Sequence, residues 1–129
     1  MKKLIWIILT MLLLTACGQN KAKNQEAVYV NITAEEAKKI MDNEEGYVIL
    51  DTRTQEEFDE GHIPGAILIP YDAITEKAET MLTDKNQLIL VYCRSGRRSK
   101  LASEDLVKLG YTNIKEFGGI IDWPYETTK

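Results

Sequence analysis

Residues 88–99 have the sequence Leu-Ile-Leu-Val-Tyr-Cys-Arg-Ser-Gly-Arg-Arg-Ser, in which five apolar residues lead directly into a cysteine and three arginines. An unbroken apolar run of this length is typical of a central parallel strand that is buried on both faces. Beyond it, apolar residues recur at helical spacing at Ala102, Leu106 and Leu109. We therefore expect a strand-to-helix turn at residues 93–99, where main-chain N–H groups would converge on an anion.

Cys93 stands in the setting of a nucleophilic cysteine. A cysteine attacks as the thiolate, and neighbouring positive charge and helix N-terminal N–H groups favour that form. Arg94, Arg97 and Arg98 supply the charge. Gly96 permits the tight turn that directs the loop amides inward. The alternative is a buried structural cysteine beside a solvated arginine cluster, but cysteines that only fill a core do not need such a setting.

Strands and helices are predicted to alternate through residues 28–125. A Thr-Ala-Glu-Glu capping box at 33–36 and apolar residues at helical spacing between 74 and 82 predict two helices, and a short helix is expected at 55–59. Strands are expected at residues 28–30, 47–50, 66–69, 88–92 and 114–117. This alternation implies an α/β fold with a parallel central sheet flanked by helices on both faces.

Polar residues follow two of these strands. In folds of this kind, ligands lie beyond the carboxyl ends of the strands. Asp51 and Arg53 follow the second predicted strand, and Cys93 follows the fourth. We therefore expect all three residues near one site.

The N-terminal residues have the pattern of a bacterial lipoprotein signal. Lys2 and Lys3 precede residues 4–14, which are apolar except for one threonine and are too few to remain as a membrane-spanning helix. Residues 14–17, Leu-Thr-Ala-Cys, resemble the lipobox, in which the cysteine thiol receives a diacylglyceryl group and becomes the mature N-terminus.

These features predict the organisation of the chain. We expect a signal peptide at 1–16, a polar lipid-anchored linker at 17–27 that begins with a lipidated Cys17, and one domain at 28–125. The expected location is the cell membrane, through the lipid anchor, outside the cytoplasm. The alternative is ordinary secretion, with Cys17 unmodified.

The chain is acidic, with a formal net charge of −4. Removal of Lys2 and Lys3 with the signal peptide leaves fourteen basic against twenty acidic residues. Such acidity argues against nucleic acid as a partner. One histidine and one cysteine besides Cys17 are too few for a metal site, and no cofactor is implied. The sequence leaves the oligomeric state open.

Four motifs together resemble the single-domain rhodanese family. They are Asp51-Thr-Arg53, the Glu-Glu-Phe and Gly-His-Ile-Pro-Gly-Ala segments within 56–66, the loop at 93–99, and Gly118-Gly119-Ile120 with Trp123. The resemblance implies a central parallel sheet and transfer of sulfane sulfur through a persulfide on Cys93. The partners it implies are a small anionic sulfur donor, such as thiosulfate, and a thiol acceptor.

The resemblance also implies roles for individual residues. The residues expected to bind the anionic substrate are Arg94, Ser95, Gly96, Arg97, Arg98 and Ser99. Ser99 is in addition a candidate N-cap of the following helix. Two roles are open for Asp51 and Arg53: an ion pair that ties the loop to the neighbouring strand, or reception of the substrate anion by Arg53. His62 is expected to be a hydrogen-bonded turn residue rather than a base, and Trp123 a packing residue.

Two other functions would use the same loop. Related folds use a cysteine–arginine loop in phosphatases and arsenate reductases, but that loop resembles Cys-x5-Arg, whereas four residues separate Cys93 from Arg98. A non-catalytic module that binds anions, persulfides or a partner protein is the other alternative, and the presence of Cys93 counts against it. After Trp123 the chain departs from the family pattern, which leaves open how the C-terminal side of the site is closed.

Overall fold

The computed structural model describes residues 28–129. The predicted signal peptide, residues 1–16, and the predicted linker with Cys17, residues 17–27, lie outside the described residues. Within the described part, no helix has the length and apolar character needed to cross a membrane.

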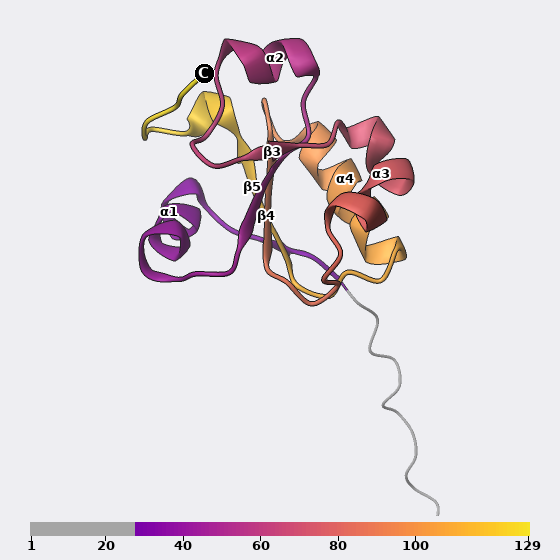
Figure 1. Ribbon diagram of the computed structural model, residues 1–129. Coiled ribbons are helices and arrows are strands. Elements are labelled where there is room, and N and C mark those ends of the chain that lie inside the picture. Colours follow the sequence, from indigo (N-terminus) through magenta and orange to yellow (C-terminus); the bar gives the residue numbers. More distant parts are fainter. Residues whose placement is uncertain (1–27) are drawn as a thin grey trace, which may run out of the picture.

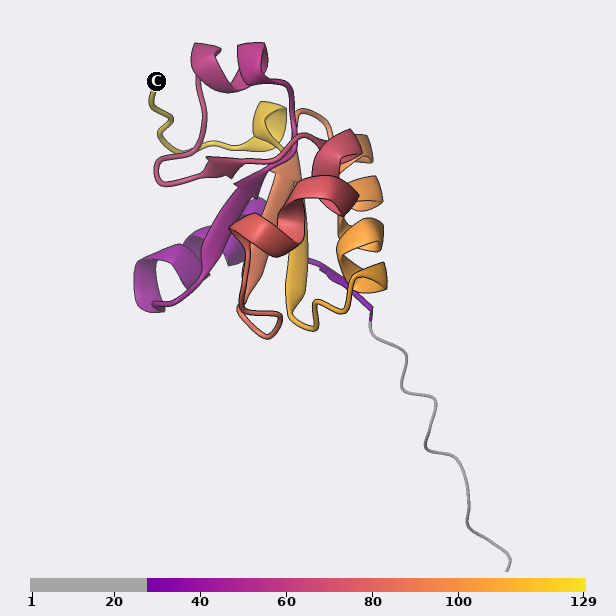
Figure 2. The ribbon, with the colours of Figure 1, turned by 45° about the vertical axis from the view of Figure 1, so that its right-hand side comes forward.

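Five parallel strands form one sheet in the order β1-β5-β4-β2-β3. The strands are β1 (Val30–Asn31), β2 (Val48–Asp51), β3 (Ile67–Leu68), β4 (Ile89–Cys93) and β5 (Ile114–Gly119). The helices are α1 (Ala34–Asn43), α2 (Gln55–Glu60), α3 (Ile74–Met81) and α4 (Arg97–Lys108), with short 3-10 turns η3 (Tyr71–Ala73) and η4 (Ile120–Asp122). Helix α1 covers one face of the sheet, α3 and α4 cover the other, and α2 lies over the carboxyl ends of the strands (Figure 1, Figure 2). This is the α/β fold that the sequence predicts.

Strand β4 is the buried centre of the sheet, and all five of its residues are buried. Ile89 and Val91 pack into the core beneath α3 and α4. Leu90 and Tyr92 pack into the core beneath α1. Because both faces are covered, every residue of the strand is apolar, which explains the unbroken run in the sequence.

Local signals set the ends of the helices. Thr33 caps α1: its hydroxyl accepts a hydrogen bond from the Glu36 amide at 3.0 Å, and the Glu36 carboxylate accepts one from the Thr33 amide at 2.9 Å. This reciprocal pair is the predicted capping box. Gly110, with φ of +98°, follows α4 and ends it in the left-handed conformation that favours glycine.

Among the boundaries that differ from the prediction, two have a direct structural cause. Gly96 rather than Ser99 is the N-cap of α4, so the predicted capping role of Ser99 is wrong. The left-handed φ of +112° at Gly96 already turns the chain out of the strand, and the helix can begin at the next residue. Strand β1 begins at Val30 rather than Val28, because its pairing with β5 starts at Val30.

Candidate active site

Cys93 is the last residue of β4 and is fully buried. The amide of Gly96 donates a hydrogen bond to its Sγ at 3.0 Å, and Ser99 Oγ lies 3.3 Å from the same sulfur. The left-handed turn at Gly96 directs this amide back toward the sulfur. The loop therefore offers an N–H donor and a hydroxyl to a negative charge on Cys93.

Strand β5 and the 3-10 turn that follows it hold the cysteine loop through main-chain contacts. Gly119 pairs with Cys93 in the sheet, and the Ile121 amide donates a hydrogen bond to the Arg94 carbonyl at 3.2 Å. A Cβ atom on Gly119 would lie 1.8 Å from the Arg94 carbonyl oxygen. The loop and β5 thus approach more closely than any residue with a side chain allows.

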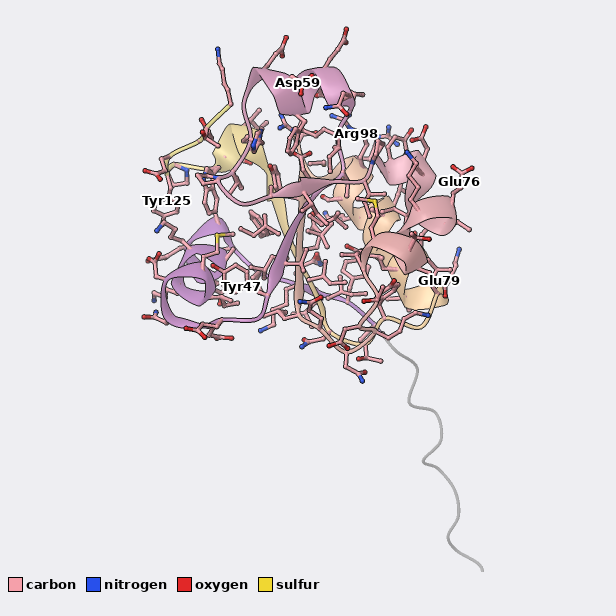
Figure 3. The ribbon with its side chains drawn as sticks, viewed as in Figure 1. Tyr47, Asp59, Glu76, Glu79, Arg98 and Tyr125 are labelled. Atoms are coloured by element: carbon pink, nitrogen blue, oxygen red, sulfur yellow. The ribbon has the colours of Figure 1, made fainter. Side chains whose placement is uncertain are left out.

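The three loop arginines are placed differently. Arg94 and Arg97 are exposed, and within residues 28–129 neither forms a salt bridge. Arg98 lies at the end of the sheet that α2 covers (Figure 3). Its guanidinium pairs with both carboxylate oxygens of Glu57, at 2.7 and 3.0 Å. Hydrogen bonding from Arg98 lowers the pKa of Glu57 to about 2. Arg94 and Arg97 are therefore the loop arginines that have no ion-pair partner among the described residues.

Asp51 and Arg53 form a buried ion pair beside the site. Arg53 Nη2 lies 2.7 Å from Asp51 Oδ2 and donates a second hydrogen bond, also of 2.7 Å, to the Gly61 carbonyl. Tyr92 Oη donates to Asp51 Oδ2 at 2.6 Å, and burial, together with the Asp51 charge, raises the pKa of Tyr92, so the phenol keeps its proton. The pair thus connects the ends of β2 and β4 with the turn at Gly61, which favours the structural role among the two that the sequence leaves open.

A buried carboxylate lies beside the loop, and it is not among the residues that the sequence predicts for the site. Glu116 of β5 is only 2% exposed, and its Oε2 accepts hydrogen bonds from Ser99 Oγ at 2.5 Å and from the Gly118 amide at 3.0 Å. The prediction for residues 114–117 is a strand, with no site role for Glu116. A carboxylate between the buried residues Ile114 and Phe117 is the signal that could have revealed it.

The other described residues that the sequence singles out make no hydrogen bond to Cys93 Sγ. Ser95 is exposed on the loop. His62 Nδ1 lies 2.8 Å from the Phe58 carbonyl, and its ring stacks on Phe58 with centroids 3.7 Å apart, as expected of a turn residue. Its main chain pairs with Thr128 through two hydrogen bonds of 2.8 Å, so the C-terminal segment returns to this turn. Trp123 packs against Phe117, which agrees with a packing role.

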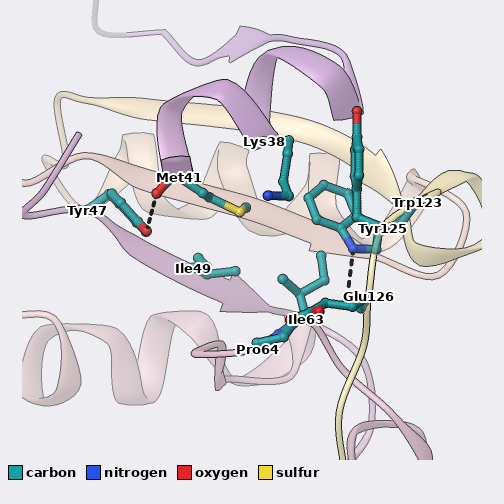
Figure 4. Close-up of a pocket in the computed structure, with 9 residues that line it drawn as sticks. All are labelled: Lys38, Met41, Tyr47, Ile49, Ile63, Pro64, Trp123, Tyr125 and Glu126. Atoms are coloured by element: carbon teal, nitrogen blue, oxygen red, sulfur yellow. Dashed lines mark hydrogen bonds between the residues drawn. The ribbon is translucent and has the colours of Figure 1, made fainter. Parts of the chain in front are cut away.

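A separate pocket of about 390 Å³ lies beside α1 (Figure 4), and none of the residues that line it belongs to the cysteine loop. Two of its aromatic residues have their polar atoms engaged: Tyr47 Oη donates to the Met41 carbonyl at 3.0 Å, and Trp123 Nε1 donates to the Glu126 carbonyl at 3.2 Å. In the part of the chain that the structure describes, no three histidine, cysteine or acidic side chains gather as metal ligands would.

The fold and the loop together define a class: a parallel α/β protein with one cysteine held at a strand-to-helix turn. The family model for the rhodanese-like domain matches residues 33–124. The chain therefore belongs to the rhodanese-like family of sulfurtransferases, and the resemblance seen in the sequence is confirmed.

Curated relatives and solved structures agree with this assignment. The chain is 40% identical over 73 residues to thiosulfate sulfurtransferase PspE of Escherichia coli, covering 57% of this chain and 70% of the relative. It is 40% identical over 95 residues to the putative sulfurtransferase YtwF of Bacillus subtilis, covering 74% and 89%. The putative sulfur carrier protein YrkF of the same species matches over 58% of its length. A solved structure described as rhodanese with anions from E. coli superposes with a TM-score of 0.61 at 36% identity, covering 64% of this chain and 98% of the other.

Proposed function

We propose that this protein transfers sulfane sulfur from a small anionic donor, such as thiosulfate or a persulfide, to a thiol acceptor through a persulfide on Cys93. The main support is the 3.0 Å hydrogen bond from the Gly96 amide to Sγ, because the same donor can stabilise a thiolate and a persulfide anion. The names of PspE and YtwF support the reaction class.

Transfer requires two displacements. The Cys93 thiolate attacks the outer sulfur of thiosulfate, a new S–S bond forms, and sulfite leaves with the electron pair of the bond that breaks. The acceptor then attacks the terminal sulfur of the persulfide, and the sulfur of Cys93 leaves as the thiolate. The first step brings an anion toward a dianion, and the exposed Arg94 and Arg97 would offset that repulsion.

The shape of the loop favours sulfur transfer over phosphate or arsenate chemistry. Each residue adds at most about 3.3–3.6 Å of chain, so a loop one residue shorter than Cys-x5-Arg forms a narrower ring. A single sulfur on Cys93 suits such a ring better than a whole oxyanion. Arg98, which would close a phosphatase-type ring, is instead paired with Glu57.

The proposal extends to the location of the protein, outside the cytoplasm and anchored in the cell membrane by lipid on Cys17. Its support is the charged start, the short apolar stretch and the Leu-Thr-Ala-Cys ending of the first seventeen residues.

Intact mass and activity test the reaction. After exposure to thiosulfate, the protein should gain the mass of one sulfur at Cys93 and should form thiocyanate when cyanide is added. Cys93→Ser should do neither while keeping its circular dichroism spectrum. A protein that binds thiosulfate without gaining sulfur would be a non-catalytic module. Hydrolysis of an aryl phosphate or reduction of arsenate without sulfur transfer would favour the phosphatase or reductase alternative.

A further inference from the structure

Three buried side chains form a line from the site sulfur into the sheet. Cys93 Sγ lies 3.3 Å from Ser99 Oγ, which lies 2.5 Å from Glu116 Oε2. The relative exposure of these residues is 0%, 0% and 2%, so little water competes for their contacts. The family activity requires the cysteine, but nothing in the two-displacement scheme uses Glu116.

The surroundings of Glu116 leave its charge uncompensated. Its neighbours in the sheet, Asn31 on β1 and Val91 on β4, carry no charge. Burial, and then the negative charges of Glu104 and Glu116, raise the pKa of Tyr29, so a second carboxylate and a neutral phenol lie on this side of Glu116.

Salt bridges do not supply a counter-charge either. Among residues 28–129, no salt bridge includes Glu116. Arg98, on the same helix as Ser99, is engaged by Glu57. A buried carboxylate that has no cation is costly, so its hydrogen bonds and its place beside the site need a physical explanation.

The Ser99 hydroxyl has one proton, so it can donate to only one of its neighbours at a time. The hydroxyl lies near several acceptors, the Gly96 carbonyl at 3.0 Å among them, but its shortest contact is with Glu116. When the hydroxyl donates to Glu116, a lone pair of Oγ is left to face Cys93 Sγ. That arrangement accepts the proton of a thiol.

We propose that Glu116 receives the proton of the Cys93 thiol through Ser99. The thiol proton moves to Ser99 Oγ as the hydroxyl proton of Ser99 moves to Glu116 Oε2. The electron pair of the S–H bond stays on sulfur as the thiolate, and Glu116 becomes a neutral acid. Afterwards Glu116 donates to Ser99, and Ser99 donates to the thiolate.

This transfer keeps the charge of the buried site constant. One negative charge moves from the carboxylate to the sulfur, so no second anion is created in a region of low dielectric constant. Its use in turnover rests on the proposed function. A thiol acceptor takes the terminal sulfur of the persulfide as its own persulfide anion, and its proton passes to the departing Cys93 thiolate. The relay then removes this proton and restores the thiolate.

The dependence of Cys93 alkylation on pH tests the relay. Iodoacetamide is added to the full chain, and modification is measured at the Cys93 peptide by mass spectrometry, so that Cys17 does not contribute. In the wild type, forming the thiolate does not change the number of protons on the protein, so we expect a rate nearly independent of pH around neutrality. Glu116→Gln keeps an acceptor for Ser99 and for the Gly118 amide but cannot take a proton. In this variant we expect a rate at least tenfold lower at pH 7 that rises about tenfold per pH unit.

Further variants separate the relay from a structural role. Ser99→Ala should reproduce the profile of Glu116→Gln, and Ser99→Thr, which retains the hydroxyl, should retain the flat profile. Ser103→Ala is the matched control, because Ser103 Oγ lies one turn further along α4, is buried, and has no hydrogen-bond partner within the described residues. This substitution should leave the profile unchanged. Circular dichroism checks that each variant is folded.

Two results would overturn the relay. A Glu116→Gln profile equal to that of the wild type would show that Glu116 only holds Ser99. A faster rate at neutral pH would show that the Glu116 charge opposes the thiolate. Alkylation needs no sulfur donor, so it tests the relay independently of sulfur transfer. If Glu116→Gln loses the flat profile while the wild type transfers no sulfur, the relay stands and only the proposed function is refuted.

Discussion

Gly119 is the residue that sets how closely β5 approaches the cysteine loop. Its φ of −136° is ordinary extended backbone that any residue adopts, so conformational freedom is not the reason for glycine here. The reason is space, because a Cβ atom would lie 1.8 Å from the Arg94 carbonyl oxygen and 2.5 Å from the Ser95 amide nitrogen. The obstacles are main-chain atoms, which cannot move aside without moving the loop.

Gly119→Ala should therefore disturb the site more than the rest of the fold. We expect unfolding to become easier by about 1–3 kcal/mol, the usual cost of forced overpacking. Displacement of the loop by about 1 Å should lower the rate of thiocyanate formation about 100-fold. Urea denaturation and the thiosulfate–cyanide assay measure the two effects.

The matched control for this variant is Gly46→Ala. Gly46 has a φ of +80° but no atom within 4 Å of the Cβ position, so it reports backbone strain without a clash. This control should lose some stability, about 1 kcal/mol, and keep its activity. Wild-type activity in Gly119→Ala would show that the close approach is dispensable.

At this scale, the sequence reveals the residues whose role depends on their neighbours in the chain. Cys93 and Gly96 could be identified because the strand, the cysteine and the turn are contiguous. The contact of Glu116 with Ser99 could not be predicted, because the two residues are 17 positions apart and meet only once β5 lies beneath α4. The pairing of Arg98 with Glu57, across 41 residues, was likewise beyond a local pattern.

Among the elements, helix α2, which lies over the carboxyl ends of the strands, is connected to the start of α4 by an ion pair. Thr54 caps α2 in a capping box with Glu57, and the same Glu57 carboxylate receives the guanidinium of Arg98 from α4. One acidic residue thus starts α2 and connects it with the first turn of α4.

Glu57→Gln should weaken this connection in a manner that depends on pH. Glutamine can still complete a capping box, so the change removes mainly the charge of the ion pair. The pKa of Glu57 is lowered from its ordinary value of 4.5 to about 2, so the pair stabilises the fold fully above pH 4.5, and this contribution is lost as pH falls toward 2. We expect the wild type to exceed Glu57→Gln by about 1 kcal/mol in unfolding free energy at pH 7 and by almost nothing near pH 2.

Urea denaturation at several pH values between 2 and 7 measures this difference. Glu56→Gln is the control, because Glu56 is exposed on the same helix and forms no salt bridge within the described part of the chain. Its stability should follow that of the wild type. If the difference in unfolding free energy between the wild type and Glu57→Gln stayed constant down to pH 2, the ion pair would not be its cause.

The order and type of the elements could be predicted because each has a local signal, whereas their ends depend on pairing. The apolar run at 66–69 extends beyond β3, since β3 pairs with β2 only at Ile67 and Leu68. The start of α4 depends on the left-handed turn at Gly96, which the presence of glycine permits but does not require.

At the scale of the whole molecule, the proposed lipid anchor depends on where the described chain begins relative to the cysteine loop. Val28, where the described chain begins, precedes β1, and β1 pairs in parallel with β5. The chain therefore enters from the end of the sheet opposite α2 and the cysteine loop (Figure 1, Figure 2). A lipid attached before Val28 would leave the site accessible from the side away from the attachment.

Cys17→Ser should therefore separate location from activity. We expect the variant to leave the membrane fraction, because the thiol that receives the lipid is gone. It should keep its rate of thiocyanate formation, because Cys93 and the loop lie within residues 28–129. Cys93→Ser is the reciprocal control: it should stay with the membrane and lose sulfur transfer. Fractionation of cells, followed by the assay on each fraction, measures both properties. If Cys17→Ser still partitions into detergent as the wild type does, lipid on Cys17 does not hold the protein at the membrane.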